Sequence, residues 1–398
     1  MNQLRALSRK AWRRCSSLAA RIGSLARRAD SVVRRRRPAV CENVEAWAST
    51  RPDSQYRIVL PPRRLTRNLP HTVEPAIHDA FLDRQVAELR AKYLVRIDGA
   101  RVVGANGLVV LPDGAHVADA VYGRPVLEDE PDYHAPRRRP VVRKDGSYFS
   151  LVVIWSNNRN YYHWMHDTLL RLHGVKEWLP EDVKYIVPKK HLAPFKLETL
   201  RLLGIEEKQL VYFTGDEIWE TEALYHSCPT SNSGGSRPEP LRWLRDSIMG
   251  ALEIAPTDSG RRKIYVSRKN TNRRRIVNED EVEHFLQGRG FETVFPETLS
   301  FRQQVELWAQ TDAVVAPSGA ALTNMIFAPP GLAVVNMNQR NRMEWSYVFW
   351  TMADVLGHDY WYLTTEDASR RSEDADASVP LEKLAETLDR LQLDGRPS

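Results

Sequence analysis

The sequence has little of what marks several large classes of protein. Its 398 residues include three cysteines, Cys15, Cys41 and Cys228, which lie far apart and lack the spacing of a metal site. So few thiols argue against a disulfide scaffold and favour a reducing compartment. No run approaches the roughly 18 consecutive apolar residues of a membrane-spanning helix, and no internal repeat is visible. We therefore expect a cytoplasmic globular protein.

Positive charge is concentrated at one end of the chain. Residues 1–37 carry 12 Lys and Arg and one acid, Asp30, a net charge of +11. The remaining residues hold 45 basic and 50 acidic side chains, a net charge of −5. A nucleic-acid-binding core would carry its basic residues in the folded body. The charge distribution therefore argues against a nucleic-acid partner for that body.

The basic end has helical periodicity. Apolar residues recur at spacings of three and four from Leu4 to Val32, with arginines over most of the remaining surface, and Pro38 ends the pattern. We assign residues 1–41 to a basic amphipathic tail. Such a helix binds an anionic membrane surface, which would place the protein at the inner face of the membrane. A disordered basic arm or a weak coiled coil would fit the same residues.

The body alternates predicted strands and helices, which is typical of an α/β fold with mostly parallel sheets. Residues 42–255 begin with a Pro-rich surface segment up to Arg90 and a β-hairpin region at Leu94–Tyr122. In this half we predict strands at Tyr148–Trp155, Val183–Val187 and Gln209–Phe213, and helices at Tyr161–Trp178, Leu192–Leu203 and Leu241–Leu252.

The second half, residues 256–366, has the clearer pattern, and residues 367–398 form an acidic linker and a C-terminal helix. Its predicted strands are Lys263–Val266, Glu292–Phe295, Ala313–Ala316, Ala333–Asn336 and Tyr360–Leu363. Its predicted helices are Asn278–Arg289, Ser300–Gln310, Gly319–Phe327 and Glu344–Leu356. Length and pattern together predict two Rossmann-like domains, which bind ligands at the carboxyl ends of their strands.

Small residues join one predicted strand of the second half to the next helix. In the stretch from Val314 to Asn324, Gly319 and Ala320 allow a ligand close to the backbone, and Ser318 is a good N-cap. The exposed N–H groups and the helix dipole favour an anion such as a diphosphate. An ordinary tight connection would have the same pattern.

Arginines follow a neighbouring strand. Ser267 and Arg268 come at the carboxyl end of Lys263–Val266, and three arginines follow at positions 273–275. The planar guanidinium suits phosphate, and we expect Arg268 and Arg275 to bind it while at least one other arginine is solvated. Glu297, after the next strand, would hold a ribose or sugar hydroxyl, or pair with an arginine.

A histidine and a carboxylate lie one helical turn apart in the first half. On an α-helix, His163 and Asp167 would lie opposite the apolar face made by Met165, Leu169 and Leu172. Asp167 would then orient His163 and raise its basicity, which makes a proton-transfer unit. A polar outer face of the helix is the alternative. We interpret the neighbouring His166 as structural.

Taken together, these motifs resemble glycosyltransferase family 61, which includes bacterial capsule-type enzymes, plant xylosyltransferases and animal N-acetylglucosaminyltransferases. The resemblance runs from about Tyr93 to Leu363. It rests on the order and spacing of Asn160-Tyr-Tyr-His163 with Asp167, Val266-Ser-Arg268, Arg275-Ile-Val-Asn278-Glu279, Phe295-Pro-Glu297 with Leu299-Ser300, and Gly319-Ala-Ala-Leu322 with Phe327-Ala-Pro329.

The resemblance implies a GT-B fold, an acceptor domain at 42–255, a nucleotide-sugar donor held mainly by 256–366, and inversion at the anomeric carbon. The acceptor would be a glycan or polysaccharide, as in capsular polysaccharide biosynthesis. The family commonly has histidine before the Gly-Ala-Ala turn, where this chain has Ser318. Serine can cap a helix and donate to a phosphate, but it carries no positive charge.

These residues define a set of expected roles. His163 would be the base and Asp167 its orienter, although Asp167 could also act as the base itself. Donor contacts would come from Ser267, Arg268, Arg275, Glu297, Ser318, Gly319, Ala320 and Asn324. No metal or other cofactor is expected, because the one Asp-x-Asp, Asp374-Ala-Asp376, lies in a polar segment after the last strand. A catalytically inactive glycan- or nucleotide-binding scaffold is the main alternative.

Overall fold

The computed structural model describes residues 38–51, 54–134, 139–155, 159–230, 235–255, 262–367 and 374–392. The predicted tail helix lies outside these ranges, so it stays a prediction. Val40–Cys41, which the sequence placed in the tail, form strand β1 and pair in parallel with β9 (His116–Val117). From Val40 onward the chain forms one structural unit.

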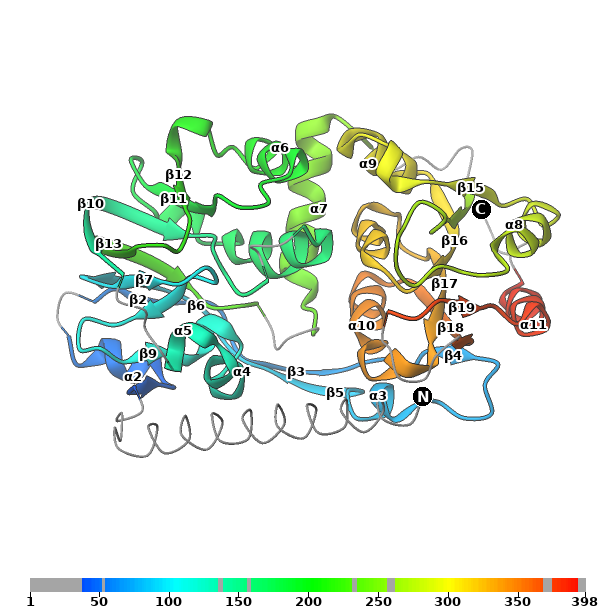
Figure 1. Ribbon diagram of the computed structural model, residues 1–398, viewed down its shortest axis with the longest axis horizontal. Helices are drawn as coiled ribbons and strands as arrows, with labels where there is room; N and C mark the ends of the chain where they lie inside the picture. The colour runs from blue at the N-terminus through cyan, green and yellow to red at the C-terminus, as the bar shows by residue number, and fades with distance from the viewer. Residues whose placement is uncertain are drawn as a thin grey trace, which may run out of the picture. The chain divides into compact units, whose positions relative to one another are not determined.

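The more regular of the two large sheets belongs to the second half of the chain (Figure 1). Its strands run in the order β15-β14-β16-β17-β18-β19, and all neighbours except β18 and β19 are parallel. The bounds are β14 Arg262–Val266, β15 Glu292–Val294, β16 Thr311–Pro317, β17 Ala333–Gln339, β18 Asp359–Asp367 and β19 Ala377–Ser378. Every residue of β17 is buried, as expected for a parallel strand covered on both faces. The five predicted strands are confirmed.

Helices cover this second sheet and continue the alternation that the sequence predicts. They are α8 Glu279–Gln287, α9 Phe301–Ala309, the 3₁₀ helix η7 Ala320–Phe327, α10 Tyr347–Leu356 and α11 Leu381–Leu391. Ser300 caps α9 through a reciprocal pair of hydrogen bonds with Gln303. No helix in the described ranges is long and apolar enough to cross a bilayer.

The first sheet is mixed. Its parallel part has the order β12-β11-β10-β13, and β6 and β7 pair with β13 in antiparallel fashion. The bounds are β6 Lys92–Asp98, β7 Arg101–Val103, β8 Leu108–Val110, β10 Val141–Ser150, β11 Lys184–Pro188, β12 Leu210–Phe213 and β13 Ile218–Ser227. Strand β13, which joins the parallel part to the antiparallel part, was not predicted from the sequence. The first part of β13 is only partly buried, so it can carry the charged side chains of Glu220 and Glu222. These two glutamates interrupt the apolar pattern that would have predicted a strand.

The segment from Glu42 to Arg90, predicted to be a Pro-rich surface segment, contains several strands and helices. After α2 (Val44–Ser49), β2 (Tyr56–Leu60) pairs with β6 in the first sheet. A two-stranded ribbon, β3 (Arg63–Thr66) with β5 (Val86–Leu89), follows (Figure 1). Between its strands come β4 (His71–Thr72), which pairs with β18, and the short helix α3 (Asp79–Leu82). A segment that the sequence assigned to the first domain therefore completes the second sheet.

A shared hydrophobic core joins the two halves. Helix α7 (Pro238–Leu252) contacts the short helix η3 (Leu169–Leu172) of the first half and both η7 and α10 of the second. One continuous cluster of buried residues includes Phe149 and Leu169 beside Val314 and Ile326. The two sheets therefore share one hydrophobic core.

Candidate active site

The segment that carries His163 and Asp167 is not an α-helix. His163–Thr168 form a π-helix, η2, and η3 continues it as a 3₁₀ helix, where a single α-helix from Tyr161 to Trp178 was predicted. All of η2 after His163 is buried, and Asp167 is 4% exposed. Asp167 therefore does not lie on a polar outer face, the alternative that the sequence left open, because the π-helix and its packing bury this carboxylate. Such π segments are frequent at functional sites.

Asp167 joins two imidazoles. Its Oδ2 lies 2.6 Å from Nδ1 of His163, and its Oδ1 lies 3.0 Å from Nδ1 of His166. Nε2 of His166 is 3.0 Å from Oγ of Ser236, so both nitrogens of this buried ring are engaged. These contacts favour Nδ1–H on both rings, with each Nδ1 donating to Asp167. His163 then keeps Nε2 as a proton acceptor.

The same contacts fix the ionisation of Asp167. Burial raises the pKa of this carboxyl, but the hydrogen bonds from His163 and His166 outweigh it and bring the pKa down to about 2. Asp167 is therefore an anion at neutral pH. A carboxylate with so low a pKa, with both oxygens occupied, is suited to orienting His163.

His163 faces a cleft of about 460 Å³, a volume typical of small-molecule sites. The first half contributes Trp155, Asn160 and Tyr162 to its lining as well as His163. The second half contributes residues at the carboxyl ends of its strands: Ser318, Gly319 and Ala320 after β16, Asn338 and Gln339 at the end of β17, Arg342 and Trp345 in the helix η8 (Arg340–Trp345), and Arg274 after β14. The cleft thus brings the predicted base and the predicted small-residue turn together.

Arg274 and Arg342 line the second-half side of this cleft, and Arg268 lies close enough to Arg274 to act on its charge. Arg274 is half-buried, and burial together with the charges of Arg268 and Arg342 lowers its pKa to about 10. Its Nη1 donates to the carbonyl of Ser318 over 3.4 Å, and its buried Nε has no hydrogen-bond partner in the described structure. Cations that repel one another in this way are arranged for an anionic ligand.

Arg268 lies under the turn before η7. Its Nε donates to the carbonyl of Arg274 over 3.1 Å and its Nη2 to that of Arg273 over 3.2 Å. A Cβ atom on Gly319 would lie 2.6 Å from Arg268 Nη1. A side chain at position 319 would therefore displace the guanidinium.

Ser267 supports Arg268 from below. Its Oγ donates to Oε1 of Glu279 over 2.8 Å, and the same oxygen accepts from the backbone N–H of Arg268 and the hydroxyl of Tyr265. Ser267 and Glu279 are both buried. Ser267 thus holds the loop after β14 in place and does not line the cleft.

Arg275 points elsewhere. Its guanidinium pairs with Asp376 at 2.6 Å, and Arg273 pairs with Asp374 at 3.1 Å. The Asp-x-Asp segment, which lies after the last predicted strand, therefore forms ion pairs with the arginine loop. The structure places Arg274 on the cleft instead of Arg275. Arg274 has a φ of 55°, and this left-handed turn is the local change of direction that the sequence could not show.

Two further expected donor residues lie outside the cleft lining. Glu297 is exposed in the 3₁₀ helix Pro296–Thr298. Asn324 is fully buried, accepting from the hydroxyl of Tyr161 at 2.6 Å and donating to Oε1 of Gln304 at 2.9 Å. Asn324 therefore ties the π-helix segment to η7, and so fixes the two sides of the cleft relative to each other.

The turn after β16 also differs in detail from the prediction. The following helix is 3₁₀, and Gly319 takes the cap position, so Ser318 is not the N-cap. The backbone N–H of Ser318 donates to the carbonyl of Met337 over 3.0 Å. Sequence reasoning missed Arg342 and Trp345, whose signal was their place directly after a buried strand.

Nowhere in the described part of the chain do three or more His, Cys, Asp or Glu side chains come together in a way that could hold a metal ion. The positive charge that faces the cleft is instead carried by arginines.

In this α/β fold, the cleft brings the His163–Asp167 pair and a group of arginines together. Comparison with protein families gives a match to Glycosyltransferase 61 over residues 161–335. The match confirms the resemblance to glycosyltransferase family 61 over this segment and supports glycosyltransferase activity in general. The matched segment contains His163, Asp167, Arg268, Arg274 and Gly319. A search of curated proteins found no match.

Proposed function

We propose that this protein is an inverting glycosyltransferase of the GT-B type that moves a sugar from a nucleotide-sugar donor to a glycan or polysaccharide acceptor. We place it in cell-surface polysaccharide synthesis, with residues 256–366 as the donor domain. The observation that carries the proposal is that His163 lines one cleft together with Arg274, Arg342 and the turn at Gly319. A base and a leaving-group site must face each other across the reacting carbon in a single in-line displacement.

In the proposed reaction, Nε2 of His163 removes the proton of an acceptor hydroxyl as its oxygen attacks the anomeric carbon. The bond from that carbon to the donor phosphate breaks on the opposite face, and its electron pair leaves with the nucleoside diphosphate. Asp167 stabilises the imidazolium that forms. Arg268 and Arg274, with the backbone N–H groups of the turn at Gly319, neutralise the departing charge.

We propose His163 rather than Asp167 as the base. Asp167 is almost fully buried, and both its oxygens already accept hydrogen bonds from imidazoles. His163 is the member of the pair that lines the cleft.

We propose that the reaction needs no metal ion, since guanidinium groups can neutralise a diphosphate. Arg274 also supplies a positive charge near Ser318, the position at which the family commonly has a histidine. Its guanidinium donates to the carbonyl of Ser318, so positive charge is present at this turn although serine has none. Trp345, half-exposed on the cleft, offers a face for a sugar or a nucleobase.

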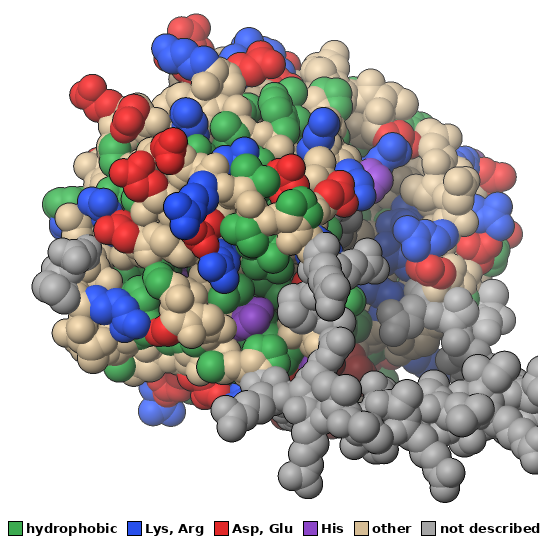
Figure 2. Space-filling model, turned by 60° about the vertical axis from the view of Figure 1, so that its left-hand side comes forward, with side chains coloured by type: hydrophobic (Ala, Val, Ile, Leu, Met, Phe, Trp, Pro, Cys, Tyr) green, Lys and Arg blue, Asp and Glu red, His purple; other side chains and the backbone are tan. Residues whose placement is uncertain are grey.

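Other binding partners fit less well. On the face shown in Figure 2, acidic and basic side chains are interspersed, which supports the expectation that the body binds no nucleic acid. Membrane docking through residues 1–37 remains a prediction about residues outside the described ranges. An inactive scaffold would have no need of the ordered His163–Asp167 pair.

The direct test is hydrolysis of a panel of nucleotide sugars by the full chain, measured as release of nucleoside diphosphate. Binding of uridine and guanosine diphosphates is followed in parallel by thermal shift, with oligonucleotides of equal charge as the comparison. We expect one nucleotide to stabilise the protein and its sugar conjugate to be hydrolysed slowly. Stabilisation by oligonucleotides alone would contradict the proposal.

A further inference from the structure

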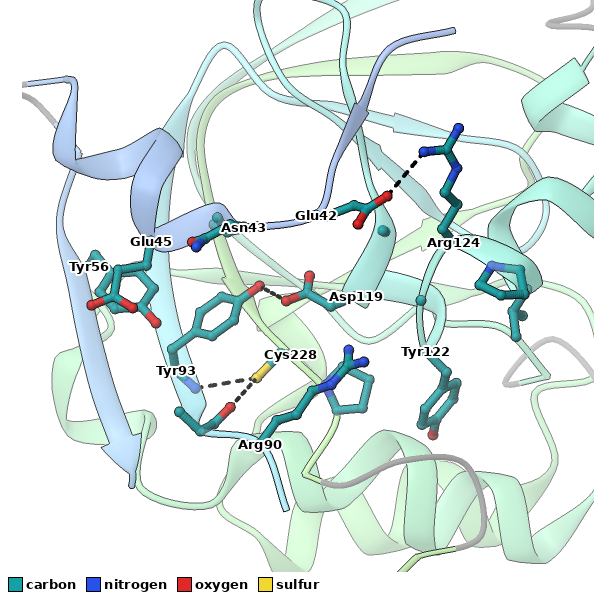
Figure 3. A pocket seen from close by; sticks show the side chains of 17 residues that line it. Glu42, Asn43, Glu45, Tyr56, Arg90, Tyr93, Asp119, Tyr122, Arg124 and Cys228 are labelled. Atoms are coloured by element: carbon teal, nitrogen blue, oxygen red, sulfur yellow. Dashed lines mark hydrogen bonds and ion pairs between the residues drawn. The ribbon is translucent and has the colours of Figure 1, made fainter. Parts of the chain in front are cut away.

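A second cavity, of about 660 Å³, opens in the first half of the chain, and none of the roles given so far uses it (Figure 3). Residues at the start of α2, on β2 and at the start of β6 form one side. The 3₁₀ helix η1 (Ala118–Val121), the start of α4 (Arg124–Asp129) and the end of β13 form the other. The cavity is large enough for a small ligand or a few sugar units.

An aromatic bridge connects this cavity to the catalytic histidine. Tyr122 lines the cavity and stacks on Trp155 with ring centroids 5.6 Å apart. Trp155 in turn packs on His163 at 5.0 Å and lines the catalytic cleft. Burial raises the pKa of Tyr122, and the nearby charge of Asp167 raises it further. Tyr122 and Trp155 therefore lie between the cavity and the cleft, with one ring lining each.

One carboxylate that lines the cavity, that of Asp119, has a hydrogen-bond partner on only one of its two oxygens. The Tyr93 hydroxyl donates to Oδ2 of Asp119 over 2.5 Å (Figure 3). The other oxygen of Asp119, Oδ1, is buried and has no hydrogen-bond partner in the described structure. An unpaired buried carboxylate oxygen costs free energy unless a ligand donor reaches it. Figure 3 shows the Arg90 side chain directed into the same space.

The charges that line the cavity select a type of ligand. Three carboxylates, on Glu42, Glu45 and Asp119, outnumber the guanidinium groups of Arg90 and Arg124. Arg124 is paired with Glu42 at 3.1 Å and with Glu128 at 2.9 Å, which leaves the carboxylates of Glu45 and Asp119 beside the guanidinium of Arg90. An anionic ligand would be repelled, whereas hydroxyl groups can donate to carboxylates and accept from Arg90.

Aromatic rings complete the lining. Tyr56 and Tyr93 lie with centroids 5.1 Å apart on the β2 and β6 side, and Tyr122 lies on the other. The Cys228 thiol is buried, accepts from the Tyr93 backbone N–H and donates to the Ala91 carbonyl, and burial raises its pKa to about 12. It is therefore an inert part of the wall. Rings beside hydroxyl acceptors suit a neutral saccharide.

We propose that this cavity is an acceptor subsite, which holds neutral sugar units of the acceptor chain beyond the one that reacts at His163. This assignment rests on the proposed transferase function and adds to it the class of acceptor: an uncharged oligosaccharide or polysaccharide longer than one sugar. The subsite contributes to acceptor binding and takes no part in binding the donor.

The test uses the full-length chain, the donor identified by the hydrolysis panel, and neutral acceptors from mono- to tetrasaccharide of one series. For the wild type, acceptor KM should fall as the acceptor lengthens. Arg90→Ala, at an exposed position, and Asp119→Asn, which keeps the size of the side chain, should raise KM for the tetrasaccharide by about tenfold, the worth of one charge-assisted hydrogen bond. Arg201→Ala, an exposed position on α6 (Pro194–Leu202), is the matched control and should change nothing.

Separate readouts distinguish the possible failures. Donor hydrolysis and KM for the monosaccharide should stay at wild-type values in Arg90→Ala. Absence of donor hydrolysis in the wild type would contradict the proposed function itself. Normal hydrolysis with the same dependence on acceptor length in the wild type and Arg90→Ala would overturn the subsite alone. Tighter binding of a uronic-acid tetrasaccharide than of the neutral one would also overturn it.

Discussion

The guanidinium of Arg268 occupies the space that a side chain at Gly319 would need, since a Cβ atom there would lie 2.6 Å from Nη1. Gly319 has an extended backbone with φ of −174°, which any residue can adopt. Its requirement is therefore one of space and not of backbone strain. The contact couples the loop after β14 to the turn after β16 at the proposed diphosphate site.

Gly319→Ala should consequently affect ligand binding more than stability. The atom it meets is the far end of a flexible side chain, so we expect a loss of about 1 kcal/mol or less in unfolding free energy. Displacement of Arg268 should weaken nucleoside diphosphate binding by about tenfold, as loss of a charge-assisted contact does. Calorimetric binding measures this, with Gly250→Ala on α7, where a Cβ meets open space, as the control. Unchanged nucleoside diphosphate binding in Gly319→Ala would show that Gly319 and Arg268 do not belong to the donor site.

Neighbouring arginines offer a matched comparison. Arg274→Ala removes a cation from the cleft and should weaken diphosphate binding by about 1.5–3 kcal/mol. Arg275→Ala removes an exposed ion pair with Asp376 and should leave binding within experimental error. Isothermal titration of both variants with the nucleoside diphosphate shows which of the two arginines contributes to its binding. The reverse order of effects would restore the assignment to Arg275 that the sequence favoured.

The metal dependence of transfer provides an independent check on the proposal that Arg268 and Arg274 neutralise the diphosphate. Transfer should persist after exhaustive treatment with a chelator, because guanidinium groups take the place of a divalent cation at the diphosphate. The measurement is the initial rate with chelator, and again after Mg²⁺ or Mn²⁺ is added back. Loss of activity with chelator and its return with metal would show that the proposal is incorrect.

His358 should make stability depend on pH. Burial lowers the pKa of this histidine from 6.5 to about 4, and its Nε2 lies 2.9 Å from the Met325 carbonyl. The unfolded chain therefore binds a proton at a higher pH than the folded protein. The stabilisation is complete above pH 6.5 and is lost as pH falls toward 4, by about 3 kcal/mol at most. Urea unfolding between pH 7 and pH 4.5 should show a shallower decline for His358→Asn, and identical declines would contradict this.

The sequence predicted the second sheet well because its strands are uniform apolar runs bounded by tight turns, as at Val314–Ala316. It missed β13, where alternating glutamates on a partly buried strand resemble a loop. The π-helix was beyond an argument from 100° periodicity, so the burial of Asp167 was not foreseen. The left-handed backbone of Arg274 decides whether Arg274 or Arg275 faces the cleft. A run of identical arginines gives no sign in the sequence of which residue adopts that conformation.

His163→Ala tests the central assignment most directly, because His163 lines the cleft while its partner Asp167 lies buried behind it. The measurement is transfer rate beside calorimetric binding of the nucleoside diphosphate, for the wild type and the variant. We predict that transfer falls by about 10²–10⁴-fold, the worth of a positioned base, while diphosphate binding stays near its wild-type value. Transfer at the wild-type rate in His163→Ala would contradict the account.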